Sequence, residues 1–168
     1  MSEEAAYVES LMRKNYDSLG FMPRPRIEWY MEHGQVLVAT ENDEPAGFLI
    51  FGNGEQTTRI YQACIQYDAR RRALGLDLVA RMVRIATAKG ALAISLWCAD
   101  DLDANEFWRA AGFAFAGQRD IANQRGRLHN RWVLQLQPQL ALSLDDAGPV
   151  AARSNASGVA TRRPDVSI

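Results

Sequence analysis

Apolar residues recur at helical spacing near the start of the chain, which predicts a first helix. Ser2, followed by two glutamates, is typical of a helix start, and we expect this helix to run up to Gly20. The apolar positions with the helical spacing are Ala6, Val8, Leu11 and Met12. The proline-containing segment 21–25 then breaks the pattern, and a second short helix is expected over 26–33, where Gly34 ends it.

The pattern next changes to short apolar runs separated by turns, which predicts three strands. Residues 35–40 and 46–51 form a hairpin around the polar turn 41–45. Residues 52–56 make another turn, and 57–67 are expected to form the third strand.

Helix and strand alternate in the following part of the chain. Apolar residues with near-helical spacing predict a helix that ends at Lys89 and Gly90. These residues are Leu76, Val79, Ala80, Val83, Ile85 and Ala86. The continuous apolar run 91–98 predicts a strand covered on both faces, and 101–111 a further helix, stopped by Gly112.

Two last strands are expected over 113–122 and 128–137. Residues 138–168 then hold half of the six prolines and no aromatic residue, so we expect a disordered tail after one domain over 1–137. The order of the predicted elements argues for an α+β sandwich around a mixed sheet.

Composition and charge exclude several classes of protein. Lys plus Arg number 19 against 20 for Asp plus Glu, so the net charge of -1 gives no global attraction to nucleic acid or membranes. Cys64 and Cys98 have neither metal-ligand spacing nor the pattern of a disulfide framework, and we expect no metal. No stretch is long and apolar enough to span a membrane, and we expect a cytoplasmic protein.

The junction between the third strand and the next helix carries the clearest chemical signal. It contains Arg70, Arg71 and Arg72, followed by the small residues Ala73 and Gly75. N–H groups at a helix start lack intrahelical partners and the helix dipole makes that end positive, so the junction predicts a phosphate site. The small residues would let a pyrophosphate approach the main chain closely.

Two motifs resemble those of the GNAT superfamily, the Gcn5-related N-acetyltransferases. Arg70-x-x-Ala73-x-Gly75, followed by the apolar pair Leu78 and Val79, is similar to the family's Arg/Gln-x-x-Gly-x-Gly/Ala loop. The segment 101–113 is similar to the family's Asn-x-x-Ala-x-x-Phe/Leu-Tyr-x-x-x-Gly-Phe. One helix and one strand separate the two motifs, as in the family.

The resemblance implies a mostly antiparallel central sheet flanked by helices and a transfer of acetyl from acetyl-CoA to a primary amine. The amine would attack the thioester directly in a ternary complex. The resemblance assigns the cofactor-binding residues in three groups. The pantetheine would lie on Ile65, Gln66 and Tyr67, the pyrophosphate on Arg70, Arg71, Arg72, Ala73, Leu74 and Gly75, and the thiol end near Asn105 and Trp108.

The chain departs from the family pattern at two positions. Trp108 stands where the family usually has a tyrosine, a candidate acid for the departing thiolate, and an indole N–H is no practical proton source. Asp101 replaces the usual asparagine and would cap the helix start.

No catalytic residue follows from the sequence, and two weak candidates stand out. Cys98 at the end of its strand would lie near the thioester, although a buried cysteine is more often a core residue. Glu32, with Glu28 and His33, lies on the short second helix that borders the acceptor site in the family.

The acceptor also stays open. The last hairpin carries Arg119, Arg125, Arg127, His129 and Arg131, which would attract an acidic acceptor. Two alternatives therefore remain beside the leading hypothesis: a non-catalytic CoA-binding or partner-recruiting module, and a transferase directed to a nucleic acid base or an aminoacyl-tRNA. A homodimer is also compatible with the family resemblance.

Overall fold

The computed structural model describes residues 2–70, 73–120 and 126–137 of the 168. Its helices are α1 (Glu3–Lys14), α2 (Tyr16–Leu19), α3 (Arg24–Glu32), α4 (Leu74–Ala88) and α5 (Ala104–Ala110), with the 3₁₀ turn η1 (Tyr67–Ala69). Its strands are β1 (Val36–Glu41), β2 (Glu44–Asn53), β3 (Thr57–Ile65), β4 (Ala93–Ala99), β5 (Ala114–Asp120) and β6 (Leu128–Gln135). Apart from the additional helix α2, this agrees with the predicted order of elements, and it agrees with the α+β class. The predicted tail 138–168 lies outside the described residues.

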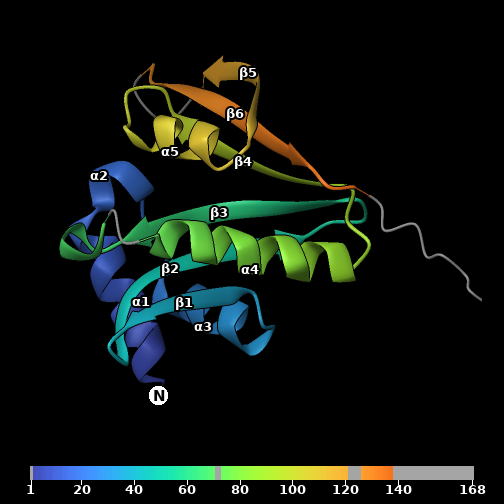
Figure 1. The fold of residues 1–168 in the computed structure, drawn as a ribbon. Coiled ribbons are helices and arrows are strands. Elements are labelled where there is room, and N and C mark those ends of the chain that lie inside the picture. Colours follow the sequence, from blue (N-terminus) through green and yellow to red (C-terminus); the bar gives the residue numbers. More distant parts are fainter. Residues whose placement is uncertain (1, 71–72, 121–125, 138–168) are drawn as a thin grey trace, which may run out of the picture.

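One six-stranded sheet in the order β1-β2-β3-β4-β6-β5 organises the fold (Figure 1). Every neighbouring pair is antiparallel except β3 and β4, which are parallel. The sheet is therefore mixed and mostly antiparallel, as expected.

Two apolar clusters lie on opposite faces of the sheet. Helices α1 and α3 pack on one face of β1–β3, where Val8, Ile27 and Phe48 are fully buried. Helix α4 covers the other face, and α5 lies on the same side over β4 and β6, where Met82, Ile94 and Trp132 belong to one cluster. Among the residues that the structure describes, the face of β4–β6–β5 opposite α5 contributes to neither cluster.

The N-terminal region confirms the predicted cap and corrects the first helix. The Ser2 hydroxyl oxygen accepts a hydrogen bond from the N–H of Ala5 at 3.2 Å, as an N-cap should. The single helix predicted up to Gly20 is divided into two helices, α1 and α2. Helix α1 ends at Lys14, and the Asn15 side chain donates to the carbonyl of Leu11 at 2.9 Å. A side chain that bonds back to the last turn competes with continuation of the helix.

Other boundaries and faces also differ from the sequence prediction; α3, for instance, begins at Arg24, inside the segment 21–25. Strand β3 ends at Ile65, and Tyr67 belongs to η1. Helix α4 buries Leu78, Val79, Met82 and Ala86, whereas Leu76 and Ala80 are exposed. The strand predicted to be covered on both faces is only half covered, since its Ser95 and Trp97 are partly exposed.

Strand β3 also contains a bulge that its sequence pattern does not reveal. Ile50 of β2 is paired with Gln62, and the next residue, Phe51, with Ile60, so that Tyr61 has no partner. The extra residue places Ile60 in the cluster under α4 and Cys64 in the cluster under α1 and α3.

Candidate active site

Strands β3 and β4 separate soon after they meet, and this divergence is the centre of the candidate site. They pair only where Thr57, Thr58 and Arg59 lie beside Ala93, Ile94 and Ser95. Farther along, β2 still pairs with β3 and β6 with β4, while the facing edges move apart (Figure 1). The facing edge of β3 from Ile60 onward therefore has no strand partner in the described chain.

The direction of one hydrogen bond shows which backbone groups line this open edge. The N–H of Gln66 donates to the carbonyl of Ala46 at 2.9 Å, toward β2. Because successive residues of a strand point their N–H and C=O groups to opposite sides, those of Ile65 and Ala63 face the open edge. Arg70 Nε donates to the Ile65 carbonyl at 3.3 Å, which agrees with this direction.

Helix α4 begins immediately beyond that edge, in a conformation suited to an anion. Ala73 precedes it in the left-handed region (φ 62°, ψ 2°), and no side chain of the described residues caps the helix. The first intrahelical bond runs from the N–H of Asp77 to the Ala73 carbonyl at 3.0 Å, so the N–H groups of the first turn lack intrahelical partners. These groups and the helix dipole favour a phosphate there. Arg71 and Arg72 lie outside the described residues.

The structure gives a packing reason for the glycine at position 75. A Cβ built on Gly75 would lie 2.9 Å from the Phe107 ring of α5. The missing side chain therefore accommodates a ring of the protein, and only the backbone of Gly75 takes part in the helix start.

Gln66 and Tyr67 turn toward helix α1. The Gln66 amide donates to the Tyr7 hydroxyl at 3.0 Å and to the Pro45 carbonyl at 3.2 Å, and Tyr67 is 81% exposed beneath the Arg70 guanidinium. A hollow of about 420 Å³ lies beside them. Its lining consists of Tyr7, Ser10, Leu11, Lys14, Asn15, Gln66, Tyr67 and Asp68. This places a polar hollow at the end of β3 next to the α4 junction.

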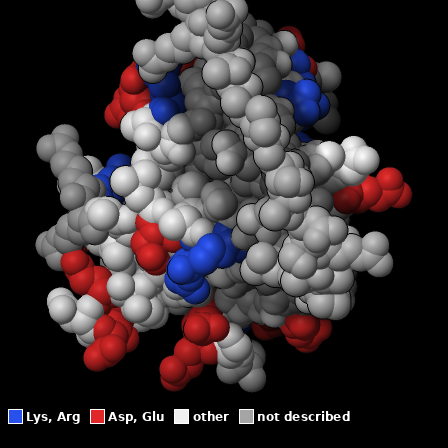
Figure 2. Space-filling model, turned by 45° about the vertical axis from the view of Figure 1, so that its right-hand side comes forward, with Lys and Arg blue, Asp and Glu red and all other residues white. Residues whose placement is uncertain are grey.

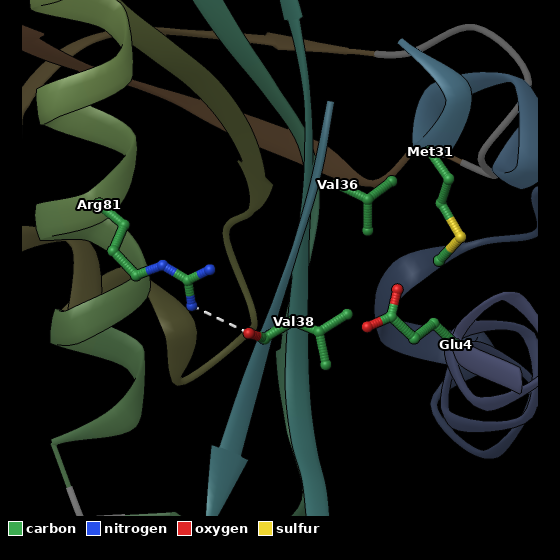
Figure 3. A pocket seen from close by; sticks show the side chains of 5 residues that line it. All are labelled: Glu4, Met31, Val36, Val38 and Arg81. Carbon is green, nitrogen blue, oxygen red and sulfur yellow. Dashed lines mark hydrogen bonds between the residues drawn. The ribbon is translucent and has the colours of Figure 1, made fainter. Parts of the chain in front are cut away.

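A second hollow, of about 200 Å³, lies at the far edge of the sheet (Figure 3). Val36 and Val38 of β1 point toward Met31 and Glu4, and Arg81 of α4 donates to the Val38 carbonyl at 2.9 Å. Strands β2 and β3 separate it from the divergence, so it is not part of the candidate site.

Helix α5 places Asn105 and Trp108 in the core rather than on the open edge. The Asn105 amide nitrogen donates to the carbonyls of Ala99 at 2.7 Å and Leu102 at 2.8 Å. Its oxygen accepts from Trp132 Nε1 at 2.9 Å and from the Asn130 amide at 3.1 Å. These bonds leave Asn105 no hydrogen-bonding capacity for a ligand.

Trp108 is buried and packs edge to face against Phe107 and Phe113, with ring centroids 5.0 and 5.3 Å apart. It anchors α5 in the core.

The two weak catalytic candidates gain no support from their surroundings. Burial raises the pKa of the Cys98 thiol to about 11, so that the thiol keeps its proton at neutral pH. Glu32 is exposed and lies about 200° around α3 from Tyr30, whose ring lies near Tyr61 on β3.

Asp101 lies outside α5, contrary to the expected capping role, because the N-cap residue is Asp103. The carboxylate of Asp101 instead pairs with Arg127 at 2.7 Å, which lowers the pKa of Asp101. Arg127 also donates to the Asp17 carbonyl of α2 at 2.9 Å, so it links the two halves of the sheet near their divergence.

A family model described as "Acetyltransferase (GNAT) family" matches residues 5–113. The chain belongs to the GNAT acetyltransferase family. The match covers both motifs and the divergence between β3 and β4. None of the curated protein sequences matches this GNAT protein.

Solved structures with 15 or 16% sequence identity share the fold. Ard1 from Thermoplasma volcanium superposes with a TM-score of 0.73 at 15% identity over 82% of this chain and 95% of its own. The aminoglycoside 6'-N-acetyltransferase from Enterococcus faecium superposes with a TM-score of 0.65 at 16% sequence identity, and the alignment covers 83% of this chain and 96% of that one. An N-acetylglutamate synthase from Neisseria gonorrhoeae was solved with coenzyme A and N-acetyl-glutamate. It superposes with a TM-score of 0.69 at 16% sequence identity, over 82% of this chain and 34% of its own.

Some features of this GNAT protein are visible only in three dimensions. The contact of Gly75 with Phe107 and the pairing of Asp101 with Arg127 join residues that the sequence pattern does not relate. Within the described ranges, no group of three or more His, Cys, Asp or Glu side chains could hold a metal ion, and no helix has the length and apolarity to cross a membrane.

Proposed function

We propose that this GNAT protein transfers an acetyl group from acetyl-CoA to a primary amine by direct attack in a ternary complex. The observation that carries the proposal is the unpaired edge of β3 leading into the uncapped start of α4. An extended chain of amides ending in a pyrophosphate needs these two features in this order: strand-like pairing groups, then an anion site.

Each part of the site has a role in the proposal. The N–H and C=O groups of Ile65, beside Gln66 and Tyr67, pair with the pantetheine. The N–H groups of Leu74, Gly75 and the residue after them hold the pyrophosphate, to which Arg70, Arg71 and Arg72 add positive charge. Catalysis then comes mainly from the orientation of donor and amine, which contributes up to about 7–11 kcal/mol in favourable systems.

Direct attack is favoured over an acyl-enzyme by the state of the cysteines. Burial raises the pKa of both Cys64 and Cys98, so neither supplies a thiolate nucleophile at neutral pH. Because Trp108 is buried and lacks an acidic proton, we assign protonation of the departing thiolate to solvent. A requirement for acetyl-CoA also fits a cytoplasmic protein.

The structural neighbours do not fix the acceptor. Their names include an aminoglycoside N-acetyltransferase and an N-acetylglutamate synthase, so the first name contains a polycationic amine and the second an anionic acetylated product. The proposal for this chain therefore stops at a primary amine.

Calorimetry with acetyl-CoA tests the donor site, with a charge placed at the start of α4. Leu76 is exposed in the first turn. Leu76→Glu should weaken binding about tenfold, through repulsion of the pyrophosphate worth roughly 1.4 kcal/mol. Leu76→Gln, of the same size and uncharged, should bind as the wild type does. Absence of acetyl-CoA binding in the wild type, or equal binding by both variants, would overturn the proposal.

Thiol release in the presence of a panel of primary amines tests the reaction itself. Release that depends on an amine is expected. Tight acetyl-CoA binding without release for any amine would instead favour the non-catalytic CoA-binding module.

A further inference from the structure

The face of β4–β6–β5 opposite α5, which no helix of the described residues covers, carries aromatic rings and arginines. Leu96 and Trp132 point toward α5, so their alternating neighbours Trp97 and Arg131, which are paired across the strands, point to the opposite face. Arg119 of β5 lies there too, with its guanidinium carbon 3.9 Å from the centroid of the Trp97 ring. Both arginines are exposed.

Strand β3 continues this face across the divergence. Arg59 is paired with Ser95 and therefore lies on the same side as Trp97. The bulged Tyr61 lies 5.5 Å from the Tyr30 ring of α3, beneath the Arg59 guanidinium, and is 41% exposed. We call the set Tyr30, Tyr61, Arg59, Trp97, Arg119 and Arg131 the aromatic–arginine face.

The aromatic–arginine face borders the open edge of β3. Tyr61 precedes Ile65 by four residues on the same strand, a rise of about 13 Å. The divergence passes between Tyr61 and Trp97, so a molecule resting on this face can present a group into the opening from the side opposite α4 and α5.

The charge on this face has one sign among the described strand residues. The side chains that β3, β4, β5 and β6 place beside Trp97 include Arg59, Arg119 and Arg131 and no Asp or Glu; Asp120 alternates to the other side. An arginine stacked on a ring keeps its N–H edge available and is held in place, which favours bidentate binding of a carboxylate or phosphate.

We propose that the aromatic–arginine face binds the acceptor, and that the acceptor is a small primary amine that also carries an anionic group and a flat apolar part. The inference rests on the proposed acetyl transfer and extends it to a substrate class. Arg119 and Arg131 bind the anion, the rings of Trp97 and Tyr61 contact the apolar part, and the uncharged amine reaches the opening. A polycationic amine is disfavoured by the same arginines.

A nucleic acid fits these observations less well. The net charge of -1 gives no general attraction to a phosphate backbone. On the one side of the molecule that Figure 2 presents, which does not define the aromatic–arginine face, Lys and Arg side chains are interspersed with Asp and Glu. Binding to a phosphate backbone uses a broad continuous basic surface, whereas the aromatic–arginine face has few arginines set among rings.

The test compares amines that differ in one group, at saturating acetyl-CoA. Tyrosine and tryptophan should give a kcat/KM at least tenfold above tyramine and tryptamine, which lack only the carboxylate, and the gain should appear mainly in KM. Kanamycin should be a poor acceptor.

Two variants connect the preference to the aromatic–arginine face. Arg119→Gln and Arg131→Gln should each reduce the preference for tyrosine over tyramine at least fivefold, mainly through a higher KM for tyrosine. Arg84→Gln, an exposed arginine on α4, removes the same charge elsewhere and should change nothing. Acetyl-CoA binding, measured by calorimetry, should be equal in all three.

Results other than these would overturn either the acceptor assignment or the proposed function. Equal or better transfer to tyramine or kanamycin, or no transfer to any anionic amine while acetyl-CoA binds normally, overturns the assignment of the acceptor and leaves the donor site standing. Loss of acetyl-CoA binding in the wild type overturns the proposed function itself. Submicromolar binding of an RNA oligonucleotide at 150 mM salt that Arg131→Gln abolishes would assign the face to nucleic acid instead.

Discussion

Gly75 and Phe107 are in contact across the opening between the two halves of the sheet: a Cβ on Gly75 would lie 2.9 Å from the Phe107 ring. One residue belongs to the first turn of α4 and the other to α5. The start of the helix that is proposed to hold the pyrophosphate is therefore fixed against the second motif by direct packing. The two family motifs meet in space at this contact.

Gly75→Ala should destabilise the fold by about 1–3 kcal/mol, because the added methyl group overpacks against Phe107. Urea unfolding measures the change. The double variant Gly75→Ala with Phe107→Leu should recover part of the loss, whereas Leu76→Ala at the exposed neighbouring position should cost under about 0.5 kcal/mol. Additive effects of the two substitutions would contradict the contact.

Asn105→Ala should destabilise the fold by about 2–4 kcal/mol, because the Trp132 indole N–H and several carbonyls lose their partner in the core. The KM for acetyl-CoA should remain near the wild-type value at a temperature where the variant is folded. The reverse result, a raised KM with unchanged stability, would show that Asn105 contacts the cofactor directly.

Asp101→Asn should destabilise the protein at neutral pH and have a smaller effect in acid. Arg127 lowers the pKa of Asp101 in the folded state. The pair therefore stabilises the fold above the ordinary carboxylate pKa of about 4, and the stabilisation is lost as pH falls through the lowered value.

Thermal unfolding of Asp101→Asn and the wild type between pH 7 and pH 3 measures how far the stability difference between the two proteins shrinks in acid. Asp43→Asn, at an exposed turn residue with positive φ, is the matched control and should not show it. A difference between Asp101→Asn and the wild type that is constant with pH would argue against the ion pair.

Cys98 should react with iodoacetamide at pH 7.5 at least roughly 100-fold more slowly than an unfolded cysteine, because a thiol with a pKa of about 11 supplies very little thiolate. Mass spectrometry of the peptide that contains it, in native buffer and in urea, gives the ratio. Cys98→Ala should retain the transferase rate. A large fall in kcat without loss of stability would restore Cys98 as a catalytic candidate.

Local signals in the sequence predicted most of the fold. The Ser2 cap, the β1–β2 hairpin and the order of elements around the α4 junction follow from spacing and turn chemistry within a few residues. The same signals failed where a distant partner decides the outcome. Asp101 has the chemistry of a cap, yet Arg127, which follows it by 26 residues, holds its carboxylate outside α5.

The candidate site likewise has one part that a local sequence signal predicts and other parts that depend on distant residues. The uncapped helix start after Arg70 is a property of one short segment, and the motif predicts it. The open edge of β3 depends on where β4 diverges, and the aromatic–arginine face depends on the register of four strands and a bulge. The hydrophobic periodicity of the sequence predicts neither feature, because only the pairing of the strands places Trp97, Arg119 and Tyr61 on one face.

The bulge at Tyr61 makes the length of β3 as important as its composition. Removing one residue there would exchange the two faces for the rest of the strand, turning Ala63 and Ile65 toward α1 and their backbone groups toward β2. A single deletion would therefore remove the open edge, the apolar contacts under α4 and the present position of Tyr61 at the same time. We expect natural relatives to vary in length in the 52–56 turn and to keep the residue count between that turn and the α4 junction unchanged.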